Sequence, residues 1–283
     1  MASSKRQSRR KPASRRGPEG PILKTAGEID AMAAAGELLV ACHDVLAREV
    51  AVGVATCALD EVAEQFMRDR GAVPAFKGYQ GYPATITTSI NEQVVHAIPG
   101  DVTLAEGDIV ALDAGLVLDG WVADMARTHP VGDVSDLARR LMEATEASLY
   151  RGIDAAQAGG RLGDIGEAVQ TVVEAAGFSV VKSLVGHGVG RSMHEQPQVP
   201  NFGSAGSGPR LAAGTVIAIE PMVNAGGHEV TLGADGWTVS SADGSLSAHY
   251  EHTVAITADG PRILTAGALT PQASDPVDRA RPR

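Results

Sequence analysis

Residues 108–131, DIVALDAGLVLDGWVADMARTHPV, form two apolar runs on either side of a Leu-Asp-Gly sequence. β-branched residues favour strands, and Asp-Gly is a strong signal for a tight turn between two strands. The segment therefore predicts a β-hairpin. Asp113 and Asp124 interrupt its two apolar runs. Because a buried carboxylate without a partner is strongly destabilising, each acid requires a positive partner.

The position of the turn decides how these two acids meet. A turn at Leu118-Asp119 makes Asp113 and Asp124 face each other directly, whereas a turn at Asp119-Gly120 makes them diagonal neighbours. Side chains alternate between the faces of a strand, so both registers place the two acids on one face of the sheet.

Two further acids lie in apolar, strand-like segments of the second half. Glu220 lies in VIAIEPM, where Pro221 favours an extended backbone before it, and Glu251 lies in AHYEHTVAI. No Lys or Arg stands beside any of the four acids in these segments, apart from Arg127 at the end of the hairpin. A divalent cation is therefore the natural counter-charge.

Residues 186–199, GHGVGRSMHEQPQV, supply two histidines seven positions apart, and their three glycines disfavour a helix. Four carboxylates and one imidazole suit Mn, Fe, Co or Zn and suffice for two adjacent ions. Of His187 and His194, one can bind metal and the other can serve a substrate. Five other histidines are interpreted as ordinary packed or surface residues: His43, His129, His228, His249 and His252.

The order of the expected elements predicts an α+β fold rather than the strict alternation of a doubly wound sheet. Helical periodicity predicts four helices. Their ends are marked by Thr56 as an N-terminal cap, Gly71 as a C-terminal stop, and Ser135 or Asp136 as an N-terminal cap. Helices are predicted within residues 25–50, 57–70, 137–156 and 165–177, and further strands within residues 84–90, 215–223, 236–241 and 248–257.

Charge and hydropathy set the broad class. The net charge of the 283 residues is −10, but residues 5–17 carry seven Lys or Arg and no acid, which leaves −17 for the rest. We expect residues 1–21 to form a disordered basic arm that contacts RNA, such as the ribosome, or is a solvated tail without a partner. Residues 267–283 are expected to be loose.

No apolar run is long enough to cross a bilayer and no secretory signal is evident, so we expect a cytoplasmic protein that does not bind membranes.

The sequence as a whole resembles the type I methionine aminopeptidases, which have the pita-bread fold of a family of metallopeptidases. The resemblance rests on Asp113, Asp124, GHGVGRSMHEQP, IEPMV and SAHYEHT in this order, and on GYPATITTSINEQVVHAIPG, which is similar to that family's substrate region. It covers residues 22–266. Five separated segments agree, which makes it far more specific than any single pair of residues.

The resemblance implies a curved antiparallel sheet flanked by helices in two halves related by a pseudo-twofold axis. It implies two divalent ions, Co, Mn, Fe or Zn, with Asp113 and Glu251 as bridging candidates. The implied metal ligands are Asp113, Asp124, His187, Glu220 and Glu251. His96 and His194 match the family's two active-site histidines that contact the peptide, and a monovalent cation near Asn91, Gln93 and Ser247 is also implied.

The implied reaction is two-metal hydrolysis that removes the initiator methionine from nascent polypeptides when the second residue is small. Glu220 is the implied proton shuttle, and the histidines stabilise the developing oxyanion. The implied wall around the methionine side chain consists of Phe76, Tyr79, Tyr82, Thr87, Met193 and Trp237. The protein is expected to be a monomer with no affinity for DNA.

Three positions depart from the commonest pattern of the family. Met193 stands where an aromatic residue is frequent, Thr87 where Cys is frequent, and Ala97 where Gly is usual. None of them is an implied metal ligand, so they bear on the size of the pocket. Two alternatives remain: another peptidase of the same fold that acts on Xaa-Pro peptides, or a non-catalytic module of this fold that binds RNA or protein.

Overall fold

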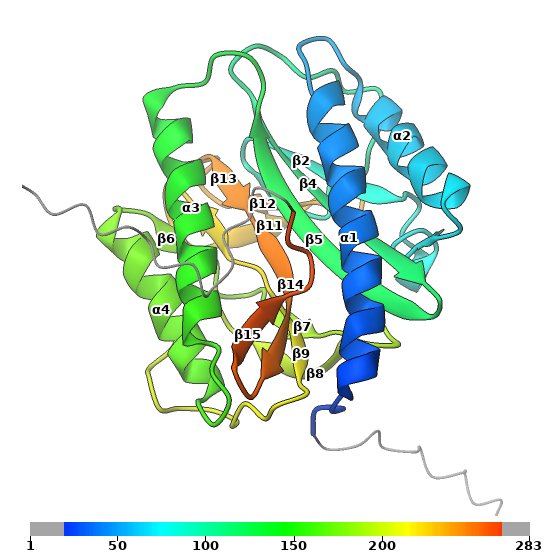
Figure 1. Ribbon diagram of the computed structural model, residues 1–283. Coiled ribbons are helices and arrows are strands. Elements are labelled where there is room, and N and C mark those ends of the chain that lie inside the picture. The colour runs from blue at the N-terminus through cyan, green and yellow to red at the C-terminus, as the bar shows by residue number, and fades with distance from the viewer. Residues whose placement is uncertain (1–19, 268–283) are drawn as a thin grey trace, which may run out of the picture.

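A nine-stranded antiparallel sheet forms the centre of the protein in its computed structural model, which describes residues 20–267 (Figure 1). The order along the sheet is β1-β4-β5-β14-β9-β7-β8, while β2 also pairs with β4 and β15 with β14. Its strands are β1 (Val73–Pro74), β2 (Ile86–Ile90), β4 (Ile109–Leu118), β5 (Trp121–Pro130), β7 (Gly186–Gly188), β8 (Glu195–Val199), β9 (Val216–Ile219), β14 (Glu251–Thr257) and β15 (Gly260–Ile263). The central strand β14 joins the first half of the chain to the second.

The predicted hairpin is formed by β4 and β5, with its turn at Asp119-Gly120. Both turn residues have positive φ, 50° and 76°, as a two-residue turn compatible with strand twist requires. Leu118 therefore pairs with Trp121, and Asp124 lies opposite Gly115. Of the two predicted registers, this is the one in which the acids are diagonal neighbours on one face.

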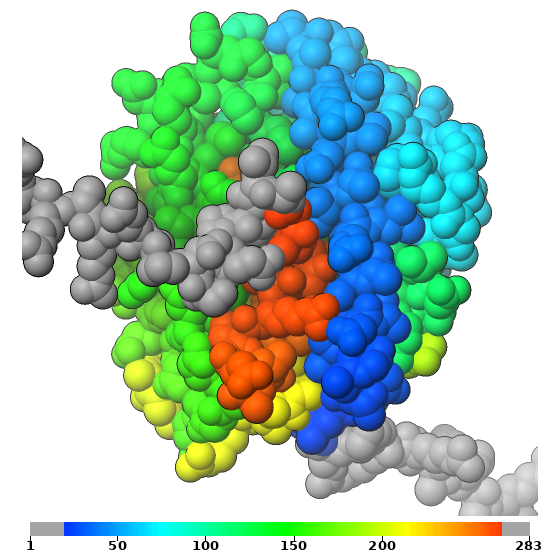
Figure 2. Space-filling view, viewed as in Figure 1, coloured from blue at the N-terminus to red at the C-terminus, as the bar shows by residue number. Residues whose placement is uncertain are grey.

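Two pairs of helices cover the sheet. α1 (Ala26–Glu49) and α2 (Thr56–Asp69) bury Leu39 and Leu59 against the first-half strands, whereas α3 (Asp136–Ala155) and α4 (Leu162–Ala175) bury residues such as Leu141 against the second-half strands. The last described strands are visible between α1 and α3 (Figure 2). This confirms the predicted α+β pita-bread architecture, a curved antiparallel sheet with helices on each half.

The helix ends confirm part of what the sequence predicts. Ser135, one of the two predicted caps of α3, accepts a hydrogen bond from the Ala138 amide. A capping box of Thr25 and Glu28, which was not predicted, starts α1. The prediction that Thr56 caps α2 is wrong. Thr56 is the first helical residue, and its hydroxyl instead exchanges hydrogen bonds with the backbone of Gly100.

Two small sheets complete the fold. They have the orders β13-β10-β6 and β11-β12-β3. Two predicted continuous strands are interrupted: residues 215–223 divide at Glu220-Pro221, and residues 248–257 divide at Tyr250. The small sheets comprise β3 (Gln93–Val95), β6 (Ser179–Val180), β10 (Met222–Asn224), β11 (Val230–Leu232), β12 (Val239–Ser241) and β13 (Ser247–His249).

The glycines of the 186–190 segment allow close backbone approach. A Cβ at Gly186 would overlap the carbonyl oxygen of Ala218, and one at Gly188 would overlap that of Gln196. The segment therefore forms β7, a short strand squeezed between β9 and β8, which sequence reasoning did not predict.

The predicted arm and tail lie almost wholly outside the described residues. Within residues 20–267, no helix is both long and apolar enough to cross a membrane.

Candidate metal centre and pocket

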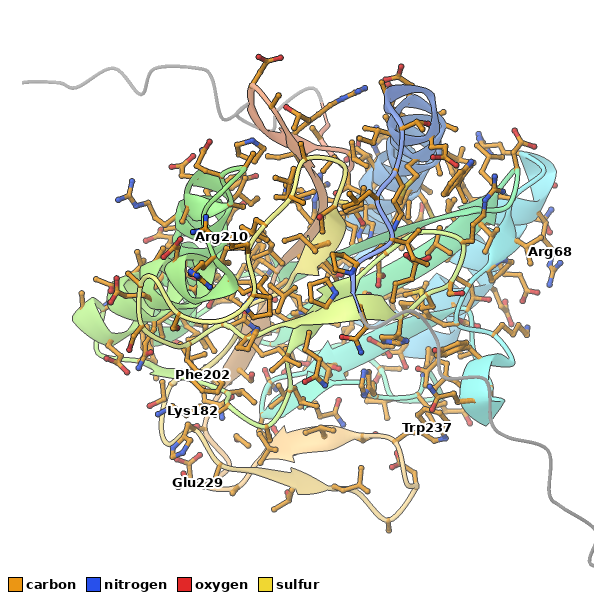
Figure 3. The ribbon with its side chains drawn as sticks, turned by 90° about the horizontal axis from the view of Figure 1, so that it is seen from below. Arg68, Lys182, Phe202, Arg210, Glu229 and Trp237 are labelled. Carbon is orange, nitrogen blue, oxygen red and sulfur yellow. The ribbon has the colours of Figure 1, made fainter. Side chains whose placement is uncertain are left out.

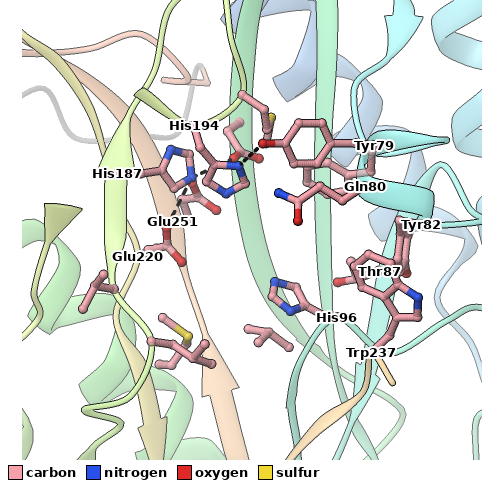
Figure 4. Close-up of a pocket in the computed structure, with 17 residues that line it drawn as sticks. Tyr79, Gln80, Tyr82, Thr87, His96, His187, His194, Glu220, Trp237 and Glu251 are labelled. Carbon is pink, nitrogen blue, oxygen red and sulfur yellow. Dashed lines mark hydrogen bonds and ion pairs between the residues drawn. The ribbon is translucent and has the colours of Figure 1, made fainter. Parts of the chain in front are cut away.

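Five predicted ligands converge from both halves of the chain. Asp113 and Asp124 come from the β4–β5 hairpin and His187 from β7, while Glu220 follows β9 and Glu251 begins β14. Three ligand atoms, one each from Asp124, His187 and Glu251, lie within 4.8 Å of one another. His187 Nε2 is 3.6 Å from Asp124 Oδ2 and 3.5 Å from Glu220 Oε1 (Figure 4).

The acids repel one another in this buried position. Burial, followed by the charges of neighbouring carboxylates, raises the pKa values of Asp113 and Glu251 well above those of exposed acids. Burial raises the pKa of Glu220 to about 8, although His187 partly opposes the shift. Burial alone would lower the pKa of His187, but Asp124 and Glu220 raise it to about 9. The chain thus concentrates negative charge that lacks a sufficient counter-charge.

His187 presents one nitrogen to these carboxylates. Its Nδ1 lies 2.9 Å from the carbonyl oxygen of Gly188 and donates to it. In the neutral ring, the lone pair is then on Nε2, the atom nearest Asp124 and Glu220.

The donor set fits divalent cations. Oxygen atoms of Asp113, Asp124 and Glu251 are buried, with no hydrogen-bond partner among the described residues. No Lys or Arg lines this pocket in the described part of the chain. Several carboxylates with one imidazole suit first-row divalent metals, whose charge would neutralise the orphaned oxygens.

A pocket of about 300 Å³ leads to these residues. Figure 4 shows His187, Glu220 and Glu251 on one side, aromatic side chains on the other, and His96 between them. Tyr82 and Trp237 pack edge to face, with ring centroids 5.1 Å apart. Trp237 lies on the segment that connects β11 to β12, at the edge of the molecule in Figure 3. All six predicted wall residues line the pocket: Phe76, Tyr79, Tyr82, Thr87, Met193 and Trp237.

His194 is held by an aromatic neighbour. The Tyr79 hydroxyl is 2.8 Å from His194 Nδ1, and the two rings stack with centroids 5.4 Å apart. Burial, reinforced by the charge of His187, lowers the pKa of His194 to about 4, so its ring is neutral at neutral pH. With the Tyr79 hydroxyl donating to Nδ1, the ring proton is on Nε2, which remains a donor.

His96 reaches the pocket from a strained backbone. Its φ of 63° is in the left-handed region, which a residue with a Cβ seldom adopts. Burial lowers the pKa of His96, although Asp124 opposes the shift. His96 therefore supplies a second imidazole that is neutral at neutral pH.

Three neighbours of the site were not predicted. His249, interpreted from the sequence as an ordinary packed residue, lies 4.0 Å from Glu220 through Nε2. Asn201 donates from its side-chain amide to the Glu220 carbonyl at 2.9 Å, and Gln80 lines the pocket. For His249 and Asn201, the sequence offers only the alternation of side chains along β13 and the proline at position 221. Neither feature reveals a contact across the sheet.

Backbone and side-chain hydrogen bonds connect the segments of the residues expected to hold a monovalent cation. The Ser247 amide donates to the Asn91 carbonyl at 2.8 Å, and the Gln93 side chain accepts from the Ile90 amide at 2.8 Å.

Comparison with known proteins adds independent information. Residues 30–258 match the model of metallopeptidase family M24. A methionine aminopeptidase of Clostridium perfringens is 51% identical over 86% of this chain and 98% of its own length. The structure of a methionine aminopeptidase from Rickettsia prowazekii, 40% identical, superposes with a TM-score of 0.86 over 87% of this chain and 100% of that one.

A prolidase of Pyrococcus horikoshii shares the fold at a lower similarity. Its TM-score is 0.71 and its identity 22%, over 87% of this chain and 64% of the prolidase.

Proposed function

The chain belongs to metallopeptidase family M24 and is an aminopeptidase that removes N-terminal methionine, and from this premise we propose that it uses two divalent ions to act on nascent polypeptides with a small second residue. The observation that carries the proposal is the convergence of three buried acids, the partly buried Glu220 and one histidine beside an aromatic pocket. A non-catalytic module would have no use for four acids in one place, three of them with buried oxygens that lack a hydrogen-bond partner.

The five converging residues are the proposed ligands of the two ions. Ligand atoms of Asp124, His187 and Glu251 lie within 4.8 Å of one another, and the charge of Asp124 also acts on Asp113. The donor set is compatible with Co, Mn, Fe or Zn.

When bound, the ions supply Lewis acidity that activates a water molecule and polarises the scissile carbonyl. Glu220 takes the proton of the attacking water and passes one to the leaving amine, a role suited to a carboxylate that lines the pocket beside His187. His96 and His194, as neutral donors, orient the peptide and stabilise negative charge on its carbonyl oxygen.

The pocket accounts for the preference for methionine. Its volume of about 300 Å³ and its aromatic lining suit a flexible thioether side chain. The second residue of the peptide would lie beside the carboxylates and His194, where a bulky side chain meets buried walls.

The test is peptide hydrolysis after chelation, followed by addition of Co, Mn, Fe or Zn one at a time. We expect the chelated enzyme to be inactive, and the restored enzyme to cleave Met-Ala-Ser but neither Met-Leu-Ser nor an Xaa-Pro peptide. Metal content at full activity should reach two ions per chain. Cleavage of the Xaa-Pro peptide alone, or no activation by any metal, would contradict the proposal.

Replacing Tyr79 with phenylalanine should impair His194. The change removes a hydroxyl that fixes the ring of His194 and costs one hydrogen bond, about 1 kcal/mol. We expect kcat/KM for Met-Ala-Ser to fall about fivefold to tenfold, with unchanged metal affinity. Tyr150→Phe, on the other side of the sheet, is the control and should leave kcat/KM unchanged.

Replacing Gly115 with alanine should narrow the pocket. A Cβ there would lie 2.8 Å from the Phe76 ring and 3.3 Å from Met193 Cε, so both side chains must shift. We expect KM for Met-Ala-Ser to rise while the metal-dependent stability is kept. An unchanged KM would show that neither side chain moves toward the substrate.

The monovalent cation site and the basic arm are also proposals. A site at Asn91, Gln93 and Ser247 predicts that K⁺ or Na⁺ raises the melting temperature relative to a bulky organic cation.

The basic arm is proposed to contact the phosphates of the ribosome in the cytoplasm, where a monomeric enzyme would meet nascent chains. Deletion of residues 1–20 should then weaken salt-sensitive co-sedimentation with ribosomes, and unchanged co-sedimentation would refute the contact.

A further inference from the structure

A buried ion pair ties the start of the fold to the segment that carries His194. Lys24 Nζ lies 2.6 Å from Glu195 Oε2, and the two side chains are only 3% and 6% exposed. Lys24 stands two residues before α1, and its amide donates to the Gly214 carbonyl at 2.7 Å. Every other ion pair between a Lys or Arg and an acid in the described residues is more exposed, so this pair differs from an ordinary surface contact.

Glu195 uses its second oxygen to fix the loop before it. Glu195 Oε1 accepts from the amides of Arg191 and Ser192, at 2.9 and 3.3 Å. The carboxylate lies where a Cβ on Gly190 would be, so any larger residue there would displace it. One carboxylate therefore joins Lys24 to the turn of residues 190–195.

The other side of the loop is fixed to the β4–β5 hairpin. The Arg191 guanidinium lies 3.7 Å from the centroid of the Trp121 ring and donates to the carbonyls of Asp119 and Gly120. The Val122 amide donates to the Gly190 carbonyl at 2.9 Å. The loop is thus bound on one side to the hairpin and on the other to Lys24.

Met193 and His194 lie between these two attachments. Met193 lines the methionine pocket, and His194 stacks on Tyr79 and faces His187 at a centroid distance of 4.2 Å. We propose that Lys24 is a positioning residue of the enzyme: through Glu195 it holds the 190–195 loop so that Met193 and His194 face the substrate. The inference rests on the proposed function for its kinetic consequence, but not for its effect on the loop.

The test compares Lys24→Met with a matched control. Lys24→Met keeps an unbranched side chain, one atom shorter, and removes its charge. Arg262→Met breaks an ion pair of the same length, 2.6 Å, between β15 and Asp30 of α1, but that pair is exposed and does not touch the loop. Lys24→Arg should rescue the pair. The double variant Lys24→Met/Glu195→Gln removes both charges. It replaces Lys24→Met in the comparison if the unpaired Glu195 prevents the single variant from folding.

Two readouts separate positioning from general stability. The first is trypsin cleavage after Arg191 relative to cleavage after Arg127 in the core strand β5, identified by mass spectrometry, because cleavage at each site follows its local opening. The second is kcat and KM for Met-Ala-Ser well below the melting temperature. We expect Lys24→Met to raise relative cleavage after Arg191 several-fold and to lower kcat/KM about tenfold or more, chiefly through KM. Mn²⁺ affinity should not change.

The outcomes are distinguishable. If Lys24→Met only lowers the melting temperature, with wild-type relative cleavage and KM, the pair is structural and the inference is wrong. The same conclusion follows if Arg262→Met gives the same changes. If the wild-type protein cleaves no methionyl peptide with any metal but Lys24→Met still releases the loop, the proposed function fails and the role of Lys24 in holding the loop stands.

Discussion

Replacing Glu220 with glutamine is expected to lower kcat for Met-Ala-Ser by about 10³-fold, within the range found for removal of a general acid–base. Glutamine keeps the shape of the side chain but cannot accept and release a proton. The position of Glu220 in the pocket, 3.5 Å from His187, favours its role in proton transfer. Glu220→Ala should be equally impaired. Kinetics are measured at saturating metal, because either change also weakens a proposed ligand.

A matched control separates this loss from general damage. Glu146 is another acid whose pKa is raised, chiefly by burial, but it lies in a cavity with Arg127 and Tyr250 rather than in the metal centre. Glu146→Gln should retain nearly wild-type kcat. Retained folding with substantial turnover in both Glu220 variants would exclude Glu220 as the proton shuttle.

The metal-free protein is expected to lose stability as the pH rises. In the folded protein burial raises the pKa of Glu220 from about 4.5 to about 8, so the folded state binds more protons than the unfolded state across that window. The stability that protonation provides is complete below pH 4.5 and is lost as the pH rises through 8. His187, raised to about 9 by Asp124 and Glu220 against the effect of burial, acts in the same direction between 6.5 and 9.

The measurement is urea unfolding of chelated and Mn²⁺-loaded protein at pH 5.5, 7 and 9. Each unit of pKa difference corresponds to about 1.4 kcal/mol, so a gap of several kcal/mol between pH 5.5 and 9 is expected without metal. Mn²⁺ should stabilise the protein most at pH 9, where the ligands are deprotonated. The difference in the free energy of unfolding between loaded and chelated samples at the same pH removes the effect of the overall charge of the protein on stability. A metal-induced gain that does not depend on pH would contradict the proposed ligand set.

The sequence predicted those features that depend on neighbours along the chain. The alternation in residues 108–131 placed Asp113 and Asp124 on one face, and the Asp119-Gly120 pair allowed the observed turn. Thr56 was misassigned as a cap because its hydroxyl finds Gly100, 44 positions away, which a local rule cannot weigh. The Glu220-Pro221 break was missed because the apolar residues on both sides read as one strand.

The remainder of the site depends on contacts between distant segments. The five ligands were assigned through the resemblance to a family, since spacing alone does not say that Asp113 and Glu251 meet. The proximity of His249 to Glu220 and the pairing of Lys24 with Glu195 arise only when strands and loops pack. Buried polar residues such as these have no periodic signature, so pattern analysis treated His249 as an ordinary packed residue.

The central position of β14 has a consequence for biosynthesis. Asp113 and Asp124 are translated long before Glu251, yet β14 must be inserted between β5 and β9 before the acids of the two halves meet. A growing chain that stops short of residue 251 would therefore expose the edges of two half-sheets and have no complete catalytic centre. The enzyme would gain its activity in one late step of its own synthesis, when this strand closes the sheet.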